Sequence, residues 1–528
     1  MQAIATDLPA SSVGQAAVRY PAIAIIVWAL ALMAPAIALG HISGHSSFFN
    51  VVWSEGFASR LVAGDFYPRW LPDVSQGGGS PVFYFYGPLP FYLIAPFHLA
   101  VDPRLAVVLG STVMLALSGL AFFQMARTFV SRRAALIAAV VYMALPYHLL
   151  ADVWARTAIG EQAAFIFLPL CLFFATRLGE GAMAVAGLAL SVAGLLYSHL
   201  PSTLAFAPFL SGYCVWVAVR KQSLQVLLHA GGAALLAAAL AAPYVAPALT
   251  LQNMIDRNFW SVFVPSEHFL FSGDGDSFKG FLEYCFAAIT VVVVLLLYQA
   301  AKAGQWSKMA PWAVMAALVV FLVTPVSSFF WNAFPILDRV QFPWRALSIF
   351  ELSAAMVLAV AIDAGRAGPA VRMFGAAVAV LTAFFIFART IAADIPPVDP
   401  HVEEQYITER ADAPEYLPSC RPAAKLEGMA SEATSLRRVT EALAVSSPRL
   451  LPVFYYPFLE VFVDGTSVAT SCDPATGRIR VETIAASYEV RRKPLAIEYW
   501  GGAIALGGLA VVIAMILLDR RRRGRSSL

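Results

Sequence analysis

The chain has 528 residues, of which 59% are hydrophobic and only 13% are charged. A water-soluble globular protein has a smaller apolar share and about 25% charged residues, so most of this chain is expected to lie in lipid. The formal net charge of +3 is small and the Lys and Arg residues lie in short polar gaps, so we expect no nucleic-acid partner.

Twelve apolar runs are long enough to cross a bilayer, which takes about 20 apolar residues in a helix. They lie near residues 20–40, 105–127, 134–150, 162–178, 182–198, 201–219, 224–249, 281–301, 310–330, 345–364, 370–389 and 496–518. A further apolar stretch, 82–101, is interrupted by Pro88, Pro90 and Pro96, which is typical of an interfacial or re-entrant segment. The sequence predicts an all-α polytopic membrane protein of about 12 transmembrane helices.

Basic residues orient these spans, because short cytoplasmic loops of membrane proteins carry an excess of Lys and Arg. With twelve spans, every second gap is basic. These gaps contain Arg127, Arg132, Arg133, Arg177, Arg220, Lys221, Lys302, Lys308, Arg366, Arg372 and Arg520 to Arg523. The pattern predicts a multi-pass protein with both termini in the cytoplasm. No basic segment with a cleavage site precedes the first run, so we expect its helix to stay uncleaved.

The same orientation divides the chain into three parts. Residues 1–390 form the predicted transmembrane module, residues 391–494 an exported β-rich domain, and residues 495–528 the last helix and a basic cytoplasmic tail. Cys171, Cys214 and Cys285 fall in apolar runs, where a thiol usually packs as a small hydrophobic group.

The first exported loop, residues 41–104, combines ionisable side chains with many aromatic rings. The ionisable residues include His45, Glu55, Asp65 and Arg69. Because Trp and Tyr favour the headgroup depth of a bilayer, we expect this loop to lie on lipid headgroups. An aromatic belt with solvated charges is the alternative.

A second group of ionisable residues lies at the exported end of the third and fourth spans. It contains Asp152, Arg156 and Glu161, and Glu161 opens an apolar helix. A charge inside a span generally faces a partner or a water-filled cavity, so a site is expected here. An Arg156–Glu161 pair that only stabilises a helix end is the alternative. His199, at the exported end of the fifth span, is either a structural hydrogen-bonding residue or a ligand.

Arg345 and Gln341 precede the tenth span in the sequence Leu337-Asp-Arg-Val-Gln-Phe-Pro-Trp-Arg345. Arginine suits phosphate because its planar group donates two parallel hydrogen bonds. The anion is therefore either a lipid phosphate or a carboxylate, that of Asp338 or of Glu161. The loop 250–280 also contains Glu267, Asp274 and Asp276, acidic residues of the kind that bind a divalent cation through oxygen.

The exported domain shows β-strand signals. Asp464-Gly465 between two apolar runs predicts a β-hairpin within a small antiparallel β-domain. Cys420 and Cys472 share this domain, and an oxidising compartment allows them to form a disulfide. The chain contains no phosphate-binding loop, dinucleotide fingerprint, zinc-ligand spacing or tandem repeat.

Five segments resemble a family of bacterial membrane proteins described as 6-pyruvoyl-tetrahydropterin synthase-related, which is similar to the GT-C glycosyltransferase superfamily. They are Gly64–Asp73, Pro81–Tyr92, Arg156 to Glu161, Ser198-His199 and Gln341–Arg345. The match runs almost end to end. It implies a bacterial inner (plasma) membrane protein with a GT-C-like fold and a periplasmic β-domain. Pterin chemistry is not expected, because the chain lacks the zinc-binding histidine trio of the soluble enzyme.

The resemblance implies transfer of a sugar from a polyprenyl-phosphate-type lipid to an envelope glycan or lipid acceptor on the periplasmic face, often with a divalent cation such as Mg or Mn. It implies an acidic base or metal ligand, for which we name Glu55, Asp65 and Glu161. Donor phosphate would bind Arg69, Arg156 and Arg345, and His45, His199 and Gln341 would line the pocket.

The first loop departs from the family pattern at one position. Relatives typically read Gly-His-Asp, whereas this chain reads Gly44-His45-Ser46, so the expected carboxylate is missing. Glu55 and Asp65 are the nearest acidic substitutes. A second hypothesis is therefore a non-catalytic transporter or assembly factor for envelope glycolipids or polysaccharide.

Overall fold

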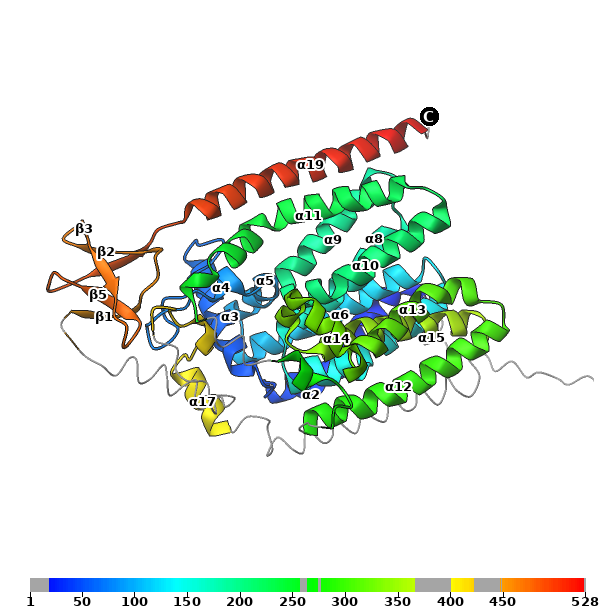
Figure 1. Ribbon diagram of the computed structural model, residues 1–528, viewed down its shortest axis with the longest axis horizontal. Helices are drawn as coiled ribbons and strands as arrows, with labels where there is room; N and C mark the ends of the chain where they lie inside the picture. Colours follow the sequence, from blue (N-terminus) through cyan, green and yellow to red (C-terminus); the bar gives the residue numbers. More distant parts are fainter. Residues whose placement is uncertain are drawn as a thin grey trace, which may run out of the picture.

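The computed structural model describes residues 19–256, 264–273, 277–365, 400–421, 447 and 449–526. The fold is mostly helical, with 70% of residues in helices and a small region of β-sheet near the C-terminus. The long helices run side by side in one bundle, and the β-strands lie beyond one end of it (Figure 1).

The long helices match most of the predicted apolar runs. They are α2 Pro21–Leu39, α6 Pro103–Ala126, α7 Arg132–Ala144 continued by the π-helix η2 Pro146–Ala155, α8 Ile159–Thr176, α9 Ala182–Ser198, α10 Leu200–Lys221, α11 Gln225–Thr250, α12 Ser277–Lys302, α13 Trp306–Leu322, α15 Leu347–Asp363 and α19 Ala496–Ser526.

Nine helices within the described ranges are long and apolar enough to cross a membrane. A tenth crossing would combine α13 with the helices η6 Pro325–Ser327 and α14 Ser328–Ala333, which are bent from it by 84°. The sequence predicted one continuous span at 310–330. The chain turns there because Pro325 has no backbone N–H to continue the helix. Helix α9 has 17 residues, and the run 370–389 lies outside the described residues. The described helices are those of a multi-pass membrane protein. They do not confirm the predicted number of twelve transmembrane helices.

The proline-interrupted stretch 82–101 forms short helices. They are α4 Val82–Phe85, α5 Leu89–Ile94 and η1 Ala95–Leu99. Helix α3, Ser47–Val62, precedes them in the first loop. Together these elements fill the space between the bundle and the strands (Figure 1).

Burial separates central helices from those that face lipid. The span that contains α15 has 89% of its apolar window buried, and that of α8 has 78%. By contrast, only 17% is buried for α19 and 22% for α11. An all-apolar helix with a largely exposed surface is suited to hydrocarbon, so α11 and α19 form part of the lipid-facing surface.

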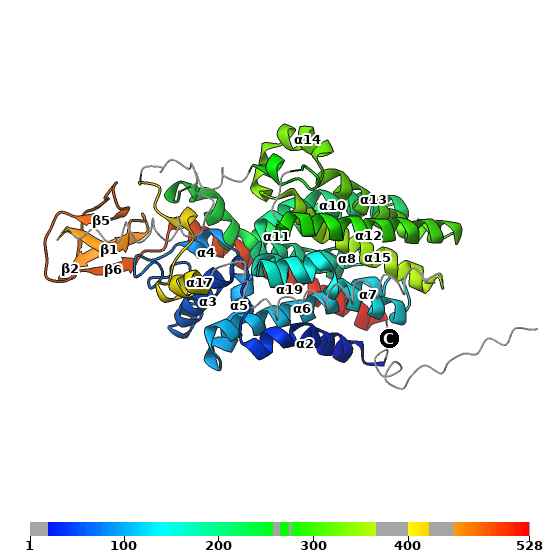
Figure 2. The ribbon, with the colours of Figure 1, turned by 90° about the horizontal axis from the view of Figure 1, so that it is seen from below.

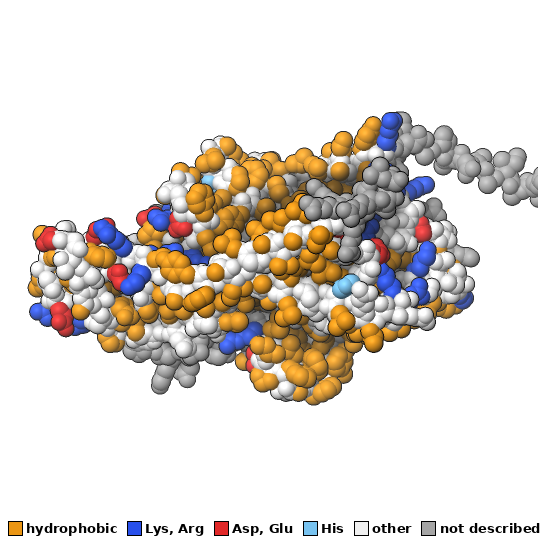
Figure 3. All heavy atoms as spheres, turned by 90° about the horizontal axis from the view of Figure 1, so that it is seen from above, with side chains coloured by type: hydrophobic (Ala, Val, Ile, Leu, Met, Phe, Trp, Pro, Cys, Tyr) orange, Lys and Arg blue, Asp and Glu red, His pale blue; other side chains and the backbone are white. Residues whose placement is uncertain are grey.

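The bundle has two chemically distinct ends. We call the end next to the strands the sheet end, and the opposite one the far end. At the far end the Lys221 ammonium lies 3.0 Å from Glu180, and Asp363 accepts a 2.8 Å hydrogen bond from the Ser131 backbone N–H. Helix α2 begins at the far end, as Figure 2 shows in dark blue. The middle of the face in Figure 3 is mostly hydrophobic, and charged side chains gather towards its two ends.

The strands form two antiparallel three-stranded sheets. One has the order β1-β5-β4, from Leu450–Phe454, Arg478–Val481 and Thr470–Cys472. The other has the order β3-β2-β6, from Thr466–Val468, Leu459–Val463 and Glu489–Arg492.

The predicted hairpin joins β2 to β3. Val463 pairs with Thr466, and the two turn residues Asp464 and Gly465 have φ of 50° and 76°, as a two-residue hairpin turn requires. Cys420 and Cys472, the pair named from the sequence, are joined by a disulfide.

The segment before the strands packs on the first loop, and it is also joined to the sheet region by the Cys420–Cys472 disulfide and by a hydrogen bond from the Tyr456 hydroxyl to the Tyr416 carbonyl. It contains α17 Pro400–Thr408 and η10 Pro414–Tyr416. Ser47 donates a 2.9 Å hydrogen bond to Glu403, and the Trp53 indole N–H donates one of 2.9 Å to Asp412. The described part of 391–494 therefore has two portions, of which only the later one is β-sheet.

Candidate functional site

Four charged side chains meet at the sheet end of the bundle. We call Asp152, Arg156, Glu161 and Arg345 the charge cluster. The Arg156 guanidinium contacts Asp152 Oδ1 at 2.5 Å and Glu161 Oε1 at 3.0 Å. Arg345 Nε contacts the same Glu161 oxygen at 2.9 Å. The cluster has two formal positive and two formal negative charges, so it is neutral as a unit, which lowers the cost of burying it.

Further hydrogen bonds hold Glu161 and Arg345 in place, whereas Asp152 Oδ2 is buried without a hydrogen-bond partner among the described residues. The Tyr147 hydroxyl donates to Glu161 Oε2 at 2.6 Å, so both oxygens of this carboxylate are occupied. Arg345 Nη1 donates to the Val340 carbonyl at 2.6 Å and to Gln341 Oε1 at 3.0 Å. Glu161 therefore serves as the anchor that holds both arginines.

Arg156 is the most accessible member of the cluster. Its side chain is 14% exposed, whereas those of Asp152 and Glu161 are 0% and 3% exposed. Its guanidinium also lies 4.7 Å from the centre of the Trp344 ring. A group that enters the cluster would meet Arg156 first.

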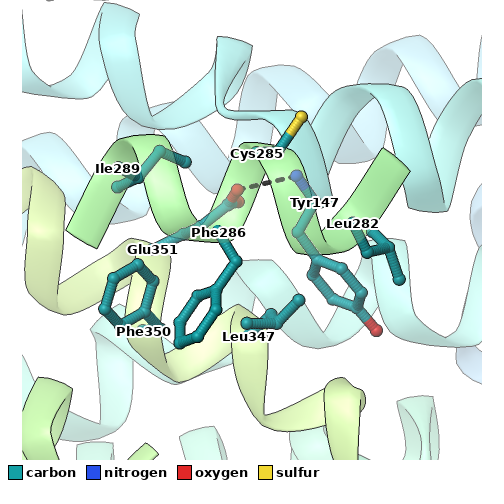
Figure 4. Close-up of a pocket in the computed structure, with 8 residues that line it drawn as sticks. All are labelled: Tyr147, Leu282, Cys285, Phe286, Ile289, Leu347, Phe350 and Glu351. Atoms are coloured by element: carbon teal, nitrogen blue, oxygen red, sulfur yellow. Dashed lines mark hydrogen bonds between the residues drawn. The ribbon is translucent and has the colours of Figure 1, made fainter. Parts of the chain in front are cut away.

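The π-helix η2 carries Asp152, and Arg156 follows directly at its C-terminal end. π-helical turns are rare and frequently occur at functional sites. The carboxyl group of Glu351, on α15, accepts a hydrogen bond of 2.7 Å from the Tyr147 backbone N–H at the start of η2 (Figure 4). It also accepts one of 2.9 Å from the His148 backbone N–H. These N–H groups have no partner within their own helix, so Glu351 caps the helix from a neighbouring one.

The sequence interpretation did not name Glu351 or Tyr147. The signal for Glu351 was a carboxylate inside the span 345–364, whose other carboxylate, Asp363, lies at the end of the span. Tyr147 had no comparable signal, because buried tyrosines are common in apolar helices.

The first loop holds the segment that follows η2. The backbone N–H groups of His45 and Ser46 donate to the carbonyls of Ala155 at 3.0 Å and Arg156 at 2.9 Å. Asn50 donates its side-chain amide to the Thr157 carbonyl at 2.6 Å. Residue 46, where the family pattern has an acid, therefore lies directly against the charge cluster's backbone.

Arg69 lies in a different network at the sheet end. Its Nε is 3.2 Å from Glu498 of α19, and its Nη2 donates to the Pro243 carbonyl at 2.7 Å. That carbonyl has no helical partner because Pro247, four residues later, lacks an N–H. Arg492 also contacts Glu498, at 2.7 Å, and so does the Tyr84 hydroxyl, at 2.7 Å. We call Arg69, Tyr84, Arg492 and Glu498 the clamp.

Glu55 and Asp65 have partners of their own outside the charge cluster. Glu55 pairs with Arg410 at 2.8 Å, and its side chain is 41% exposed. Asp65 pairs with Arg60 at 3.5 Å and is 22% exposed. Of the three carboxylates predicted from the sequence, Glu161 joins the charge cluster, and Glu55 is the most accessible to water.

The three residues predicted to line the pocket, Gln341, His45 and His199, all lie near the charge cluster. Gln341 bonds to Arg345 as described, and the His45 backbone contacts Ala155. His199 accepts at Nδ1 from the Ser202 backbone N–H at 3.3 Å and so caps α10. Its ring also lies beside Gly160, next to Glu161, since a Cβ on Gly160 would come within 3.1 Å of it.

The described residues contain no group of three or more His, Cys, Asp or Glu side chains arranged to hold a metal ion. Asp274 and Asp276 lie outside those residues. No divalent-cation site is therefore assigned among the described residues.

The sequence matches no known protein-family model and no curated protein. The assignment of a function therefore depends on the residues of the sheet end themselves.

Proposed function

We propose that the chain is a membrane glycosyltransferase that moves a sugar from a polyprenyl-phosphate-type lipid to an envelope acceptor. The observation that supports this most is the pair of arginines in the charge cluster. Arg156 and Arg345 share one carboxylate oxygen at the end of an apolar bundle, beside a loop rich in aromatic rings. Two guanidinium groups held side by side suit the phosphate of a lipid headgroup.

We infer that the sheet end faces the exported, periplasmic side and that both termini are cytoplasmic. Two features support this orientation. Of the basic loop residues that the structure describes, Arg127, Arg132, Lys221 and Lys308 lie at the far end, as is typical of cytoplasmic loops. The Cys420–Cys472 disulfide lies at the sheet end, as an oxidising compartment allows. A bacterial inner membrane provides both compartments.

In the proposed reaction a carboxylate takes the proton of the acceptor hydroxyl, whose oxygen attacks the anomeric carbon of the donor sugar. The bond from that carbon to the phosphate oxygen breaks, and polyprenyl phosphate leaves with its charge held by Arg156. Glu55 suits the role of base better than Glu161, because both Glu161 oxygens already accept hydrogen bonds and Glu55 is open to water.

The test uses the full-length protein in lipid nanodiscs with a polyprenyl-phosphate sugar donor and an envelope acceptor extract. We expect release of polyprenyl phosphate. Arg156→Ala and Glu55→Gln should each lower the rate by about 100-fold or more. The matched control is Glu460→Gln, since Glu460 is a carboxylate of β2 that pairs with Lys493. Full activity of Glu55→Gln would move the base elsewhere, and no release from any donor tested would reject the enzyme.

The alternative is a non-catalytic transporter or assembly factor for envelope glycolipids. The observation in its favour is that Glu161 is saturated and that Ser46 stands where the family pattern has an acid. A strain that lacks the protein should then accumulate a complete glycolipid on the wrong leaflet. Mass spectrometry of envelope glycans separates the two proposals, because only loss of a transferase removes a sugar.

A further inference from the structure

A cavity of about 470 Å³ lies at the far end of the bundle, between the start of α2 and the end of α6. Arg19, Arg127 and Arg132 line it, and the apolar part of its wall includes Ile23 and Phe123. Figure 2 shows the start of α2 beside α6 and α7 at the end of the molecule opposite the sheets. The cavity is thus remote from both the charge cluster and the clamp.

The three arginines have no carboxylate partner among the described residues. The ion pairs that those residues form at the far end are Lys221–Glu180 and Lys308–Asp363. Arg132 instead donates a 3.0 Å hydrogen bond to the Arg19 carbonyl, which holds two of the arginine residues together. Three like charges around one space repel one another, so an anion bound between them would be favoured.

A stripe of exposed apolar side chains begins at the cavity. Tyr20, Ile23, Val27 and Leu30 are between 47% and 60% exposed. Their spacing of three and four residues places them on one face of α2. Ten residues of helix span about 15 Å, which is half of the roughly 30 Å hydrocarbon core of a bilayer.

We propose that this cavity binds an anionic membrane lipid. Its phosphate lies among Arg19, Arg127 and Arg132, and one acyl chain follows the stripe on α2. A basic recess beside a lipid-facing helix suits a phosphate ester joined to a hydrocarbon tail better than it suits a soluble anion. The proposal does not depend on the proposed transferase activity.

The experiment measures lipid binding to the full-length protein in detergent by native mass spectrometry. Phosphatidylglycerol, which is anionic, is compared with phosphatidylcholine of the same acyl chains. We expect the wild type to prefer phosphatidylglycerol by at least tenfold. Arg127→Ala combined with Arg132→Ala should abolish the preference. Arg220→Ala is the matched control, because Arg220 is a far-end arginine on α10 that does not line the cavity.

Two further measurements test the proposal, one with a single variant and one with inorganic phosphate as competitor. The Arg127 side chain makes no hydrogen bond to the part of the chain that the structure describes, so a lower preference in Arg127→Ala alone reports binding and not misfolding. Inorganic phosphate at millimolar concentration should not displace the lipid. An unchanged preference in the double variant, equal binding of phosphatidylcholine, or full displacement by inorganic phosphate would each overturn the proposal.

Discussion

Gly44 lies where the first loop passes closest to the segment after η2. A Cβ atom at this position would lie 2.2 Å from Thr157 Oγ1 and 2.9 Å from the Thr157 backbone nitrogen. Thr157 itself has a φ of 50°, a strained value for a β-branched residue, so it has little freedom to move away.

Gly44→Ala should therefore destabilise the protein by about 1–3 kcal/mol, the usual range for overpacking. The measurement is thermal unfolding of the purified protein in detergent. Gly212→Ala is the control, because a Cβ there meets no atom within 4 Å. Equal melting temperatures for the two variants would show that the loop does not hold Thr157 as described.

The sequence identified all four residues of the charge cluster, and it offered the Arg156–Glu161 and Arg345–Glu161 pairs only as alternatives to ligand binding. Asp152, Arg156 and Glu161 were visible as ionisable groups at helix ends, and Arg345 as a cation before a span. Two anions remained open for Arg345, a lipid phosphate or a carboxylate. Arg345 and Glu161 are 184 residues apart, so their contact depends on how α8 and the segment before α15 pack, which no local pattern contains.

At the scale of elements, the Glu351 cap fixes the start of η2 and thereby the position of Arg156. Glu351→Ala would leave the Tyr147 and His148 N–H groups without an acceptor in an apolar surrounding, at about 1–3 kcal/mol each. Glu351→Gln should recover only part of this, because an amide has one acceptor oxygen. Thermal unfolding measures both losses.

Glu482→Gln is the control for the Glu351 variants, since Glu482 is exposed. If Glu351→Ala melted like this control, the cap would not stabilise η2. The π-helix was not predicted, because the apolar run 134–150 fits one continuous α-helix by composition. The break reflects Pro146 together with an acceptor on another helix.

The contact of residues 400–418 with the first loop should depend on pH through Asp412. Burial raises the pKa of Asp412 to about 7, whereas an aspartate in an unfolded chain has a pKa near ~3.9. At a pH between these two pKa values, Asp412 is therefore protonated when the segment is docked on the first loop and ionised when the segment is released. Docking should be strongest at low pH and weaken as the pH rises through 7, by at most about tenfold per pH unit for one group.

Hydrogen–deuterium exchange of residues 400–418 between pH 5 and pH 8, corrected for intrinsic rates, measures this dependence. Asp412→Asn should flatten it. A smaller dependence should persist, because burial also raises the pKa of Glu415 to about 7. Identical pH profiles for the wild type and Asp412→Asn would contradict the assignment to Asp412.

At the scale of the whole molecule, the clamp joins the first loop, the sheets and the last helix. Glu498→Ala would leave Arg69 as a buried cation without its carboxylate, at about 3–5 kcal/mol for a broken buried pair, and it would also unpair the partly exposed Arg492. Thermal unfolding should show this loss. Glu489→Gln, which breaks the exposed Glu489–Arg491 pair, should have almost no effect. Comparable losses in both variants would show that the clamp is not a structural centre.

Composition and helix length sufficed to predict a multi-pass membrane protein, and the Asp464-Gly465 pair between two apolar runs sufficed to predict the hairpin. These patterns did not show that Arg69 contacts the last helix, because nothing local to Arg69 marks Glu498 as its partner. Nor did they predict that the segment containing α17 lies on the first loop, because this contact pairs Trp53 with Asp412, which is 359 residues away in the sequence.

The clamp also has a consequence for biosynthesis. Tyr84 and Glu498 are 414 residues apart, so at about 5–20 residues per second the ribosome adds Glu498 roughly 20–80 s after Tyr84. Throughout that interval Arg69 lacks its carboxylate partner, and the clamp cannot form until α19 is made. We expect Glu498→Ala to be degraded faster in pulse-chase labelling although every helix is made. If Glu498→Ala had the same half-life as the wild type, late formation of the clamp would not affect degradation of the protein in the cell.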